Sequence, residues 1–380
     1  MKFPDYDRGT LSLSASILNF YGAESGYPAL PELNSALREK PTRNVVLLLL
    51  DGMGENLLKR KLPEDAFLVK NDRAVISAVY PSTTTAATTS LWTGVSPLEH
   101  GWLGWSLYFK ECGREIDTFL NRDSFTGDLY PGPNAAQKLM PFTTMYTHLK
   151  GRVETHAIFP FPSYATNGAD VSHVSRDLED TARLVSSLCA EPGQKLICVY
   201  NGEPDHTMHE RGVESEDTQK QFERVNRIAE SLGNRLSEDT LLIVTADHGL
   251  VDVKENVILN EIPALNDCLW MPPFIEMRAA SFFVKPHWKE KFEREFQAVF
   301  GEDFLLVPRE EVFRMNLLGR GEAHPKCDDF VGDYLACATG ERSILYQSLT
   351  SKKCEMIGQH AGLTDDEMTV PVILWRAEQK

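Results

Sequence analysis

The chain has 380 residues, of which 42% are hydrophobic and 25% are charged, and its formal net charge is −16. This length and composition predict a large buried core, with one main domain and one smaller domain. The acidic balance argues against nucleic acid or an anionic membrane as a stable partner, and no apolar stretch approaches the roughly 18 residues of a membrane span.

The first two thirds of the sequence predict alternating helices and strands. Helical spacing of apolar residues occurs at 10–21, 177–190 and 215–236. Apolar runs predict strands at 44–50, 74–80, 154–160, 195–200 and 240–245. Because these runs are rich in consecutive Val, Ile and Leu, we expect strands buried on both faces, as in a mostly parallel sheet covered by helices.

The sequence after Gly249 follows a different pattern. Short strand-like runs and one helical segment are predicted at 280–284, 287–300, 304–307, 334–338 and 344–347. This pattern indicates a compact α+β insertion. The run at 370–375 is again an apolar run like those that predict parallel strands in the first part. We therefore predict an α/β core formed by residues 1–277 and 352–380, with a smaller α+β domain inserted at 278–351.

The cysteines and the first residues predict a cytoplasmic location. The seven Cys residues are scattered and form no C-x-x-C pair, as is typical of reduced thiols. Residues 1–8 lack the basic and apolar regions of a signal peptide. Cysteines as metal ligands are the less favoured interpretation, because their spacing is not that of a zinc site.

Acidic and imidazole side chains stand next to the predicted strands. Six of them follow or precede an apolar run: Asp51, Asp205, His209, Asp247, His248 and His360. Side chains at the carboxyl ends of parallel strands share one edge of the sheet, so we expect this set to converge. Buried carboxylates need compensating charge, and mixed carboxylate and imidazole ligands favour Zn²⁺, with Mn²⁺ as an alternative. The competing interpretation is that each Asp caps a helix and each His packs in the core.

A hydroxyl-rich segment from Tyr80 to Gly94 follows the predicted strand at 74–80. A helix is expected to begin near Ser82 to Thr84, where a hydroxyl would lie beside free backbone N–H groups and close to the metals. Such a hydroxyl can serve as a nucleophile towards phosphorus. The alternative is that these Ser and Thr residues only cap the helix and pack it against the sheet.

The order of these motifs resembles the alkaline phosphatase superfamily, and within it the type I phosphodiesterase/nucleotide pyrophosphatase branch. The resemblance covers residues 44–375 and is carried by Asp51 and Gly52, Pro81 to Thr85, Asp205 and His209, Asp247 to Gly249, and His360. It implies a three-layer α/β/α sandwich, two zinc ions, and an insertion that forms a cap next to the active site.

The resemblance also implies roles for individual residues. One zinc would be held by Asp205, His209 and His360. The other would be held by Asp51, Asp247 and His248, beside Thr84, which is implied both as nucleophile and as a ligand. The branch usually has an Asn three residues after the nucleophile, whereas this chain has Ala87. The C-x-P-x-R nucleophile motif of the sulfatases does not occur in the sequence.

The expected function is hydrolysis of a phosphodiester or pyrophosphate bond in a small phosphate ester, such as a nucleotide, through a phosphothreonine intermediate. The alternative is a phosphomonoesterase, phosphonate hydrolase or phosphomutase with the same metals. Monoester specialists need an additional cation, and no Arg occurs between Thr83 and Gly94, which favours the diester. A third hypothesis is a metal-binding relative without catalytic activity.

Overall fold

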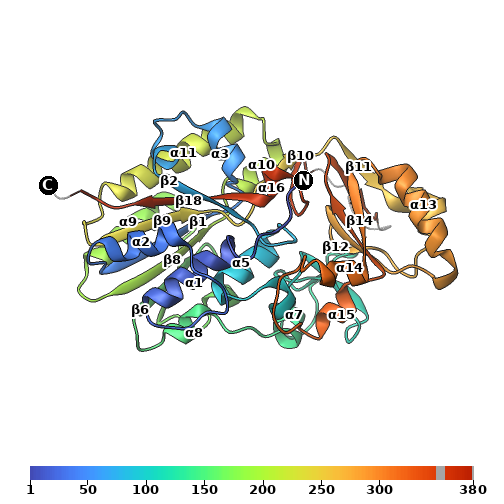
Figure 1. Ribbon diagram of the computed structural model, residues 1–380, viewed down its shortest axis with the longest axis horizontal. Coiled ribbons are helices and arrows are strands. Elements are labelled where there is room, and N and C mark those ends of the chain that lie inside the picture. The colour runs from blue at the N-terminus through green and yellow to red at the C-terminus, as the bar shows by residue number, and fades with distance from the viewer. Residues whose placement is uncertain (348–355, 379–380) are drawn as a thin grey trace.

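The computed structural model describes residues 1–347 and 356–378, and its main body is built on a central sheet (Figure 1). The strands of this sheet lie in the order β2-β18-β9-β1-β8-β6-β7. Their bounds are β1 (Asn44–Leu50), β2 (Asp72–Ser77), β6 (Glu154–Phe159), β7 (Val171–Val174), β8 (Lys195–Asn201), β9 (Thr240–Thr245) and β18 (Thr369–Trp375). Five of them match the strands predicted from apolar runs at 44–50, 154–160, 195–200, 240–245 and 370–375 within one or two residues.

The sheet is mostly parallel, as predicted, with one exception. β1 pairs in parallel with β8 and β9, and β6 pairs in parallel with β7 and β8. β18 runs antiparallel to both β2 and β9. The apolar sequence of this last strand predicts a parallel strand like the others, and the structure differs. Because its direction is reversed, the start of β18 lies at the same edge as the ends of β1, β8 and β9.

Helices cover both faces of the sheet and complete a three-layer α/β/α arrangement (Figure 1). One face carries α1 (Thr10–Phe20), α5 (Thr84–Thr93) and α8 (Met145–Leu149), with α2 (Pro31–Glu39) packed on α1. The other carries α3 (Glu55–Lys61), α10 (Asp205–Arg211) and α11 (Glu216–Gly233), with α4 (Phe67–Lys70) and α9 (Leu178–Ala190) packed on α11. All seven residues of β1 are buried, which explains its uninterrupted apolar sequence.

A second sheet forms the cap at the right-hand end of the molecule in Figure 1. Its strands lie in the order β14-β15-β13-β12-β3-β4-β5, and every pairing is antiparallel. Their bounds are β3 (Ser106–Phe109), β4 (Arg114–Asp117), β5 (Arg122–Asp123), β12 (Phe274–Glu276), β13 (Ala279–Phe282), β14 (Phe304–Pro308) and β15 (Tyr334–Ala338). The sheet thus joins two stretches of chain that lie far apart in the sequence.

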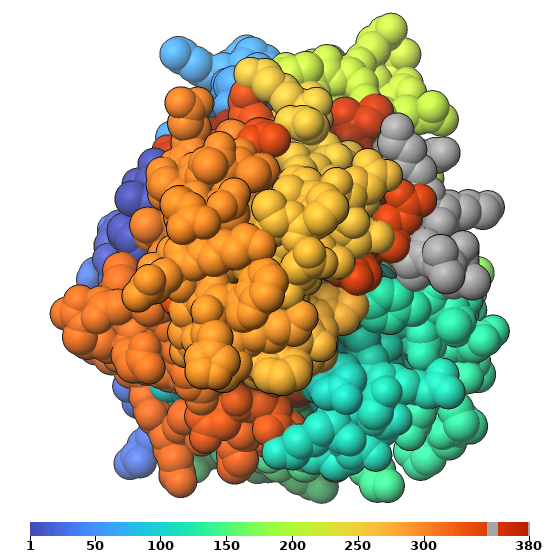
Figure 2. Space-filling view, turned by 90° about the vertical axis from the view of Figure 1, so that its right-hand side faces the viewer, coloured from blue at the N-terminus to red at the C-terminus, as the bar shows by residue number. Residues whose placement is uncertain are grey.

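Figure 2 shows these two stretches side by side on the outer face of the cap, one in turquoise and the other in gold and orange. The helices not yet named in the two parts of the chain around these strands are α6 (Pro97–His100), α7 (Ala135–Leu139), α12 (Pro263–Asn266), α13 (Lys289–Phe300), α14 (Arg309–Arg314) and α15 (Lys326–Phe330). The predicted cap boundaries, 278 and 351, remain a prediction, although the sheet itself extends beyond them into 106–123 and 274–276. The second boundary falls at 348–355, outside the described residues.

Two small ladders lie between the core and the cap. β10 (Val251–Asp252) pairs with β17 (Gly358–Gln359), and β11 (Glu255–Ile258) pairs with β16 (Arg342–Leu345). The last helix, α16 (Asp365–Met368), leads directly into β18. In the part of the chain that is described, no helix is both long and apolar enough to cross a bilayer.

Candidate active site

The six predicted residues converge at one edge of the central sheet. Each is placed by the end of a strand or by the segment joined to it: Asp51 after β1, Asp205 and His209 on α10 after β8, Asp247 and His248 after β9, and His360 before β18. The reversed direction of β18 is what brings His360 to the edge shared by the other five. Their role as metal ligands remains a prediction.

The first cluster consists of Asp51, Asp247 and His248. Each offers a ligand atom, and these atoms lie within 4.8 Å of one another. His248 Nε2 is 3.5 Å from Asp51 Oδ1 and also 3.5 Å from Asp247 Oδ2. All three side chains are buried. This is the set that the resemblance assigns to one metal.

The second cluster lies beside the first and shares His248 with it. Ligand atoms of Asp205, His248 and His360 also lie within 4.8 Å of one another. His209, which the resemblance places with Asp205 and His360, has its Nε2 3.2 Å from Asp205 Oδ2. The ring centroids of His209 and His360 are 5.1 Å apart, and those of His248 and His360 are 3.9 Å apart.

Several polar atoms in the two clusters have no hydrogen-bond partner among the described residues. These buried atoms are Asp51 Oδ1, Asp205 Oδ1, Asp247 Oδ2 and His360 Nδ1. A buried carboxylate without compensation is costly, and burial together with the neighbouring Asp247 and Asp205 raises the pKa of Asp51 well above its usual range. Burial alone would raise the pKa of Asp205, but His209 and His360 lower it. Divalent cations would satisfy these oxygens, so the residues fit a pair of metals.

Groups outside the ligand set fix the orientation of these side chains. The Tyr200 hydroxyl donates to Asp51 Oδ2, and the backbone N–H of Gly52 donates to Asp247 Oδ1 at 3.1 Å. His209 Nδ1 donates to the Gly358 carbonyl at 2.7 Å, which leaves Nε2 free to face the cluster. Sequence reasoning missed Tyr200, and the only signal for it was a hydroxyl-bearing residue near the end of an apolar strand.

Two glycines allow the backbone to pass close to the site. Gly52 has φ of +71°, and a Cβ there would lie 2.6 Å from Leu250 Cδ1 and 2.9 Å from Asp205 Cβ. A Cβ on Gly249 would collide with the Asp366 carbonyl oxygen. A side chain at either position would displace the segments that carry Asp205 and His248.

The hydroxyl-rich segment opens α5, with Thr83 as N-cap and Thr84 as the first helical residue. Thr84 Oγ1 lies 3.1 Å from His248 Nε2, next to the first cluster. Of the neighbouring hydroxyls, Ser82 donates to the Gly362 carbonyl at 2.8 Å, Thr83 donates to Glu276 at 2.6 Å, and the buried Thr85 hydroxyl has no hydrogen-bond partner among the described residues. Ala87 is fully buried in a small apolar cluster against α1. Thr84 is therefore the hydroxyl of this segment that points at the predicted ligands.

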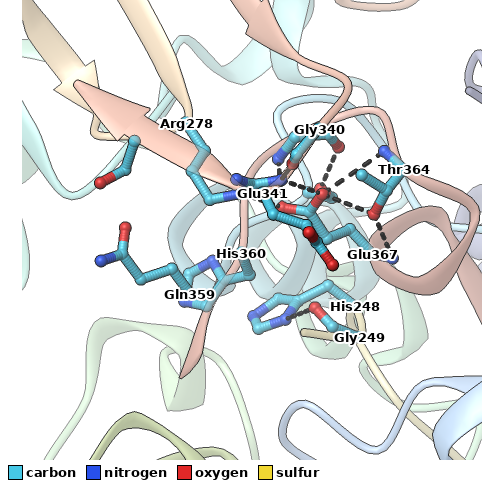
Figure 3. Close-up of polar contacts among 12 residues, drawn as sticks. His248, Gly249, Arg278, Gly340, Glu341, Gln359, His360, Thr364 and Glu367 are labelled. Carbon is cyan, nitrogen blue, oxygen red and sulfur yellow. Dashed lines mark hydrogen bonds and ion pairs between the residues drawn. The ribbon is translucent and has the colours of Figure 1, made fainter. Parts of the chain in front are cut away.

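A buried ion pair ties the cap to the segment that carries His360 (Figure 3). Arg278 Nε and Nη2 donate to the two oxygens of Glu367 at 2.7 and 2.8 Å, and neither side chain has any exposed surface. Glu367 also accepts from the backbone N–H of Gly362 at 2.8 Å and from Thr364 Oγ1 at 2.6 Å. The turn that follows His360 is thereby held against the cap.

Two carboxylate and imidazole clusters at the edge of an α/β/α sheet, with a hydroxyl at a helix N-terminus beside them, are the groups that a metal-dependent phosphoryl-transfer site requires. A family model described as type I phosphodiesterase/nucleotide pyrophosphatase matches residues 45–362, and the chain belongs to this family of metal-dependent hydrolases. No curated protein matches the sequence.

Solved structures with the same fold are similar at low sequence identity. Murine ectonucleotide pyrophosphatase/phosphodiesterase 5, an inactive variant in complex with AMP, is 16% identical with a TM-score of 0.62, over 86% of this chain and 87% of that one. Phosphonoacetate hydrolase from Sinorhizobium meliloti 1021, in complex with phosphonoformate, is 15% identical with a TM-score of 0.66, over 90% and 91% of the two chains. These similarities confirm the predicted fold class.

Proposed function

We propose that this chain hydrolyses the phosphodiester or pyrophosphate bond of a small phosphate ester, with Thr84 as the nucleophile. The observation that carries the proposal is the position of Thr84 Oγ1, 3.1 Å from His248 Nε2 at the first turn of α5. Family membership supports hydrolysis of a phosphoester in general. The bond, the metal and the nucleophile are our assignments.

Two zinc ions are the cofactors we propose, with manganese as the alternative. Asp205, His209 and His360 would hold one ion, and Asp51, Asp247 and His248 would hold the other, with Thr84 next to it. Bound ions would supply the positive charge that lowers the pKa of a coordinated hydroxyl or water and compensates charge on the phosphoryl oxygens. The unpartnered buried oxygens of Asp51, Asp205 and Asp247 support this assignment.

The residues of the chain itself would act as follows. Thr84 Oγ1 attacks phosphorus as the bond from phosphorus to the leaving oxygen breaks, and the proton that Thr84 loses is balanced by the one that the departing alcohol or phosphate takes up. Thr84 is left esterified to the remaining phosphoryl group, as a phosphothreonine. Water then attacks the same phosphorus, releases the phosphate product and restores the Thr84 hydroxyl. The free N–H groups in the first turn of α5, a helix of 10 residues, are placed to bind phosphoryl oxygens.

The second candidate is a phosphonate hydrolase, phosphomonoesterase or phosphomutase with the same residues. It is supported by the structural similarity to phosphonoacetate hydrolase. The absence of Arg from residues 84–93 favours the diester, because a monoester carries an additional negative charge. Nucleotides are one candidate substrate class, since the related murine structure contains AMP.

We also propose a cytoplasmic location, which the free thiols of the described cysteines support.

The test is replacement of the nucleophile in metal-loaded protein. We expect Thr84→Ala to lower the rate of bis-p-nitrophenyl phosphate hydrolysis by at least a thousandfold, and Thr84→Ser to retain part of the rate because it keeps a hydroxyl. The matched control is Thr88→Ala on the same helix, whose hydroxyl donates to the Thr84 carbonyl. Full activity of Thr84→Ala would overturn the assignment, and a large preference of the wild type for the monoester would favour the second candidate.

A further inference from the structure

The cap contributes one carboxylate to the neighbourhood of Thr84. Glu276 ends β12, and its Oε1 accepts a hydrogen bond from Thr83 Oγ1 at 2.6 Å. The same oxygen accepts from the backbone N–H of Trp105 at 2.7 Å. Glu276 therefore touches both the residue before Thr84 and the segment that follows α6. These contacts place the carboxylate against Thr83, the residue that precedes the proposed nucleophile.

The second oxygen of Glu276 is free of such contacts. Oε2 accepts no hydrogen bond from the described residues and is not fully enclosed by them, although the residue as a whole is largely buried. The Glu276 carboxylate also interacts electrostatically with His209. Burial lowers the pKa of His209, but Asp205, the Gly358 carbonyl and Glu276 together raise it to about 9. The contact of Glu276 with Thr83 is therefore close enough to the site for its charge to act on His209.

The nearest cationic side chain of the same hairpin does not neutralise Glu276. Arg278 lies two residues further along, and its guanidinium is bound to Glu367 and to the carbonyls of Gly340 and Arg342 (Figure 3). Its charge is therefore compensated by Glu367 and by these two carbonyls. Glu276 therefore has no cationic partner within its own hairpin, and its carboxylate lies against the residue before Thr84.

We propose that Glu276 is a specificity-determining residue that selects substrates by charge: it disfavours a phosphoryl group with two negative charges and so directs the site to phosphodiesters. The inference rests on the proposed function. Repulsion between like charges a few ångströms apart is strong where protein excludes water, and a monoester carries one more charge than a diester. A diester would approach the Glu276 carboxylate with less electrostatic cost.

The test is Glu276→Gln, which removes the charge and keeps an oxygen that can accept from Thr83 and Trp105. Metal-loaded protein is assayed at about pH 9, where p-nitrophenyl phosphate is a dianion and Glu276, whose pKa burial raises to about 7, is ionised. We expect the ratio of kcat/KM for bis-p-nitrophenyl phosphate to that for p-nitrophenyl phosphate to fall roughly tenfold. Binding of inorganic phosphate, measured by calorimetry, is expected to tighten by a similar factor.

The matched control is Glu290→Gln, which removes one charge from an exposed position of the cap and should leave the ratio unchanged. Glu276→Asp, which keeps the charge, should retain the diester preference even if its overall rate is lower. An unchanged ratio and unchanged phosphate affinity in Glu276→Gln would overturn the inference and leave the proposed function intact. Wild-type protein that hydrolyses neither ester would instead overturn the proposed function.

Discussion

At the scale of single residues, the structure separates predicted ligands from the groups that orient them. The Tyr200 hydroxyl donates to Asp51 Oδ2, and this bond fixes one oxygen so that the other faces His248. We expect Tyr200→Phe to weaken metal binding by about 10–100-fold, because loss of such an orienting hydrogen bond costs affinity. The measurement is zinc affinity in competition with a chromogenic chelator.

The control for Tyr200→Phe removes a phenol hydroxyl elsewhere. Tyr21 donates to the Lys195 carbonyl at 3.3 Å, at the opposite end of β8, so Tyr21→Phe should leave zinc affinity unchanged. Equal affinities of Tyr200→Phe and wild type would show that Asp51 is held in place by other contacts.

Individual site residues were predictable where a carboxylate or imidazole side chain follows an apolar strand in the sequence. Asp51 and Asp247 directly follow or nearly follow runs of Val, Ile and Leu, so the fold alone implied a shared edge. Glu276 could not be found in this way, because its contact with Thr83 spans 193 positions and depends on how the cap packs. Its immediate sequence carries no motif that distinguishes it from a surface Glu.

At the scale of elements, a buried ion pair is one of the contacts that attach the hairpin of β12 and β13 to the core. Arg278→Met would leave Glu367 charged and without its partner in a fully buried position. We expect this variant to lose about 3–5 kcal/mol in the free energy of unfolding, measured by urea denaturation. The double variant Arg278→Met/Glu367→Gln should recover part of that loss, since it also removes the uncompensated charge.

An exposed ion pair provides the comparison for Arg278. Arg320 pairs with Asp7, and both side chains are largely exposed, so Arg320→Met should cost no more than about 1 kcal/mol. A loss for Arg278→Met as small as that for Arg320→Met would mean that the hairpin is held to the core by other contacts.

The central strands were predictable as elements, whereas the cap strands near the nucleophile were not. Runs such as 195–200 and 240–245 are buried on both faces, and hydrophobicity alone marks them. β3 alternates buried and partly exposed residues, β4 has one buried residue, Ile116, and both strands are only four residues long. The pairing of β3 with β12 joins residues that are distant in sequence. The antiparallel direction of β18 likewise depends on the path of the whole chain.

At the scale of the whole molecule, the site joins segments that are distant in sequence and carries much of the buried negative charge. Its residues are spread along the sequence between Asp51 and His360. Three of its carboxylates have a buried oxygen without a hydrogen-bond partner among the described residues. In a chain of net charge −16, bound cations would relieve this local repulsion and connect β1, β8, β9 and β18 at one edge. Metal binding should therefore stabilise the folded core as a unit.

Removal of metal tests this coupling directly. A ligand present at one hundred times its dissociation constant contributes about 2.7 kcal/mol, so we expect chelation by EDTA to lower Tm by roughly 5 °C, and Zn²⁺ or Mn²⁺ to restore it. The relative concentration at which each ion restores Tm ranks the two candidates. A variant with Asp51→Asn and His360→Ala should show little response to either ion, because one ligand of each proposed site is lost. If EDTA and added Zn²⁺ leave the Tm of the wild type unchanged, the clusters do not bind metal, and the buried carboxylates must be compensated by protonation.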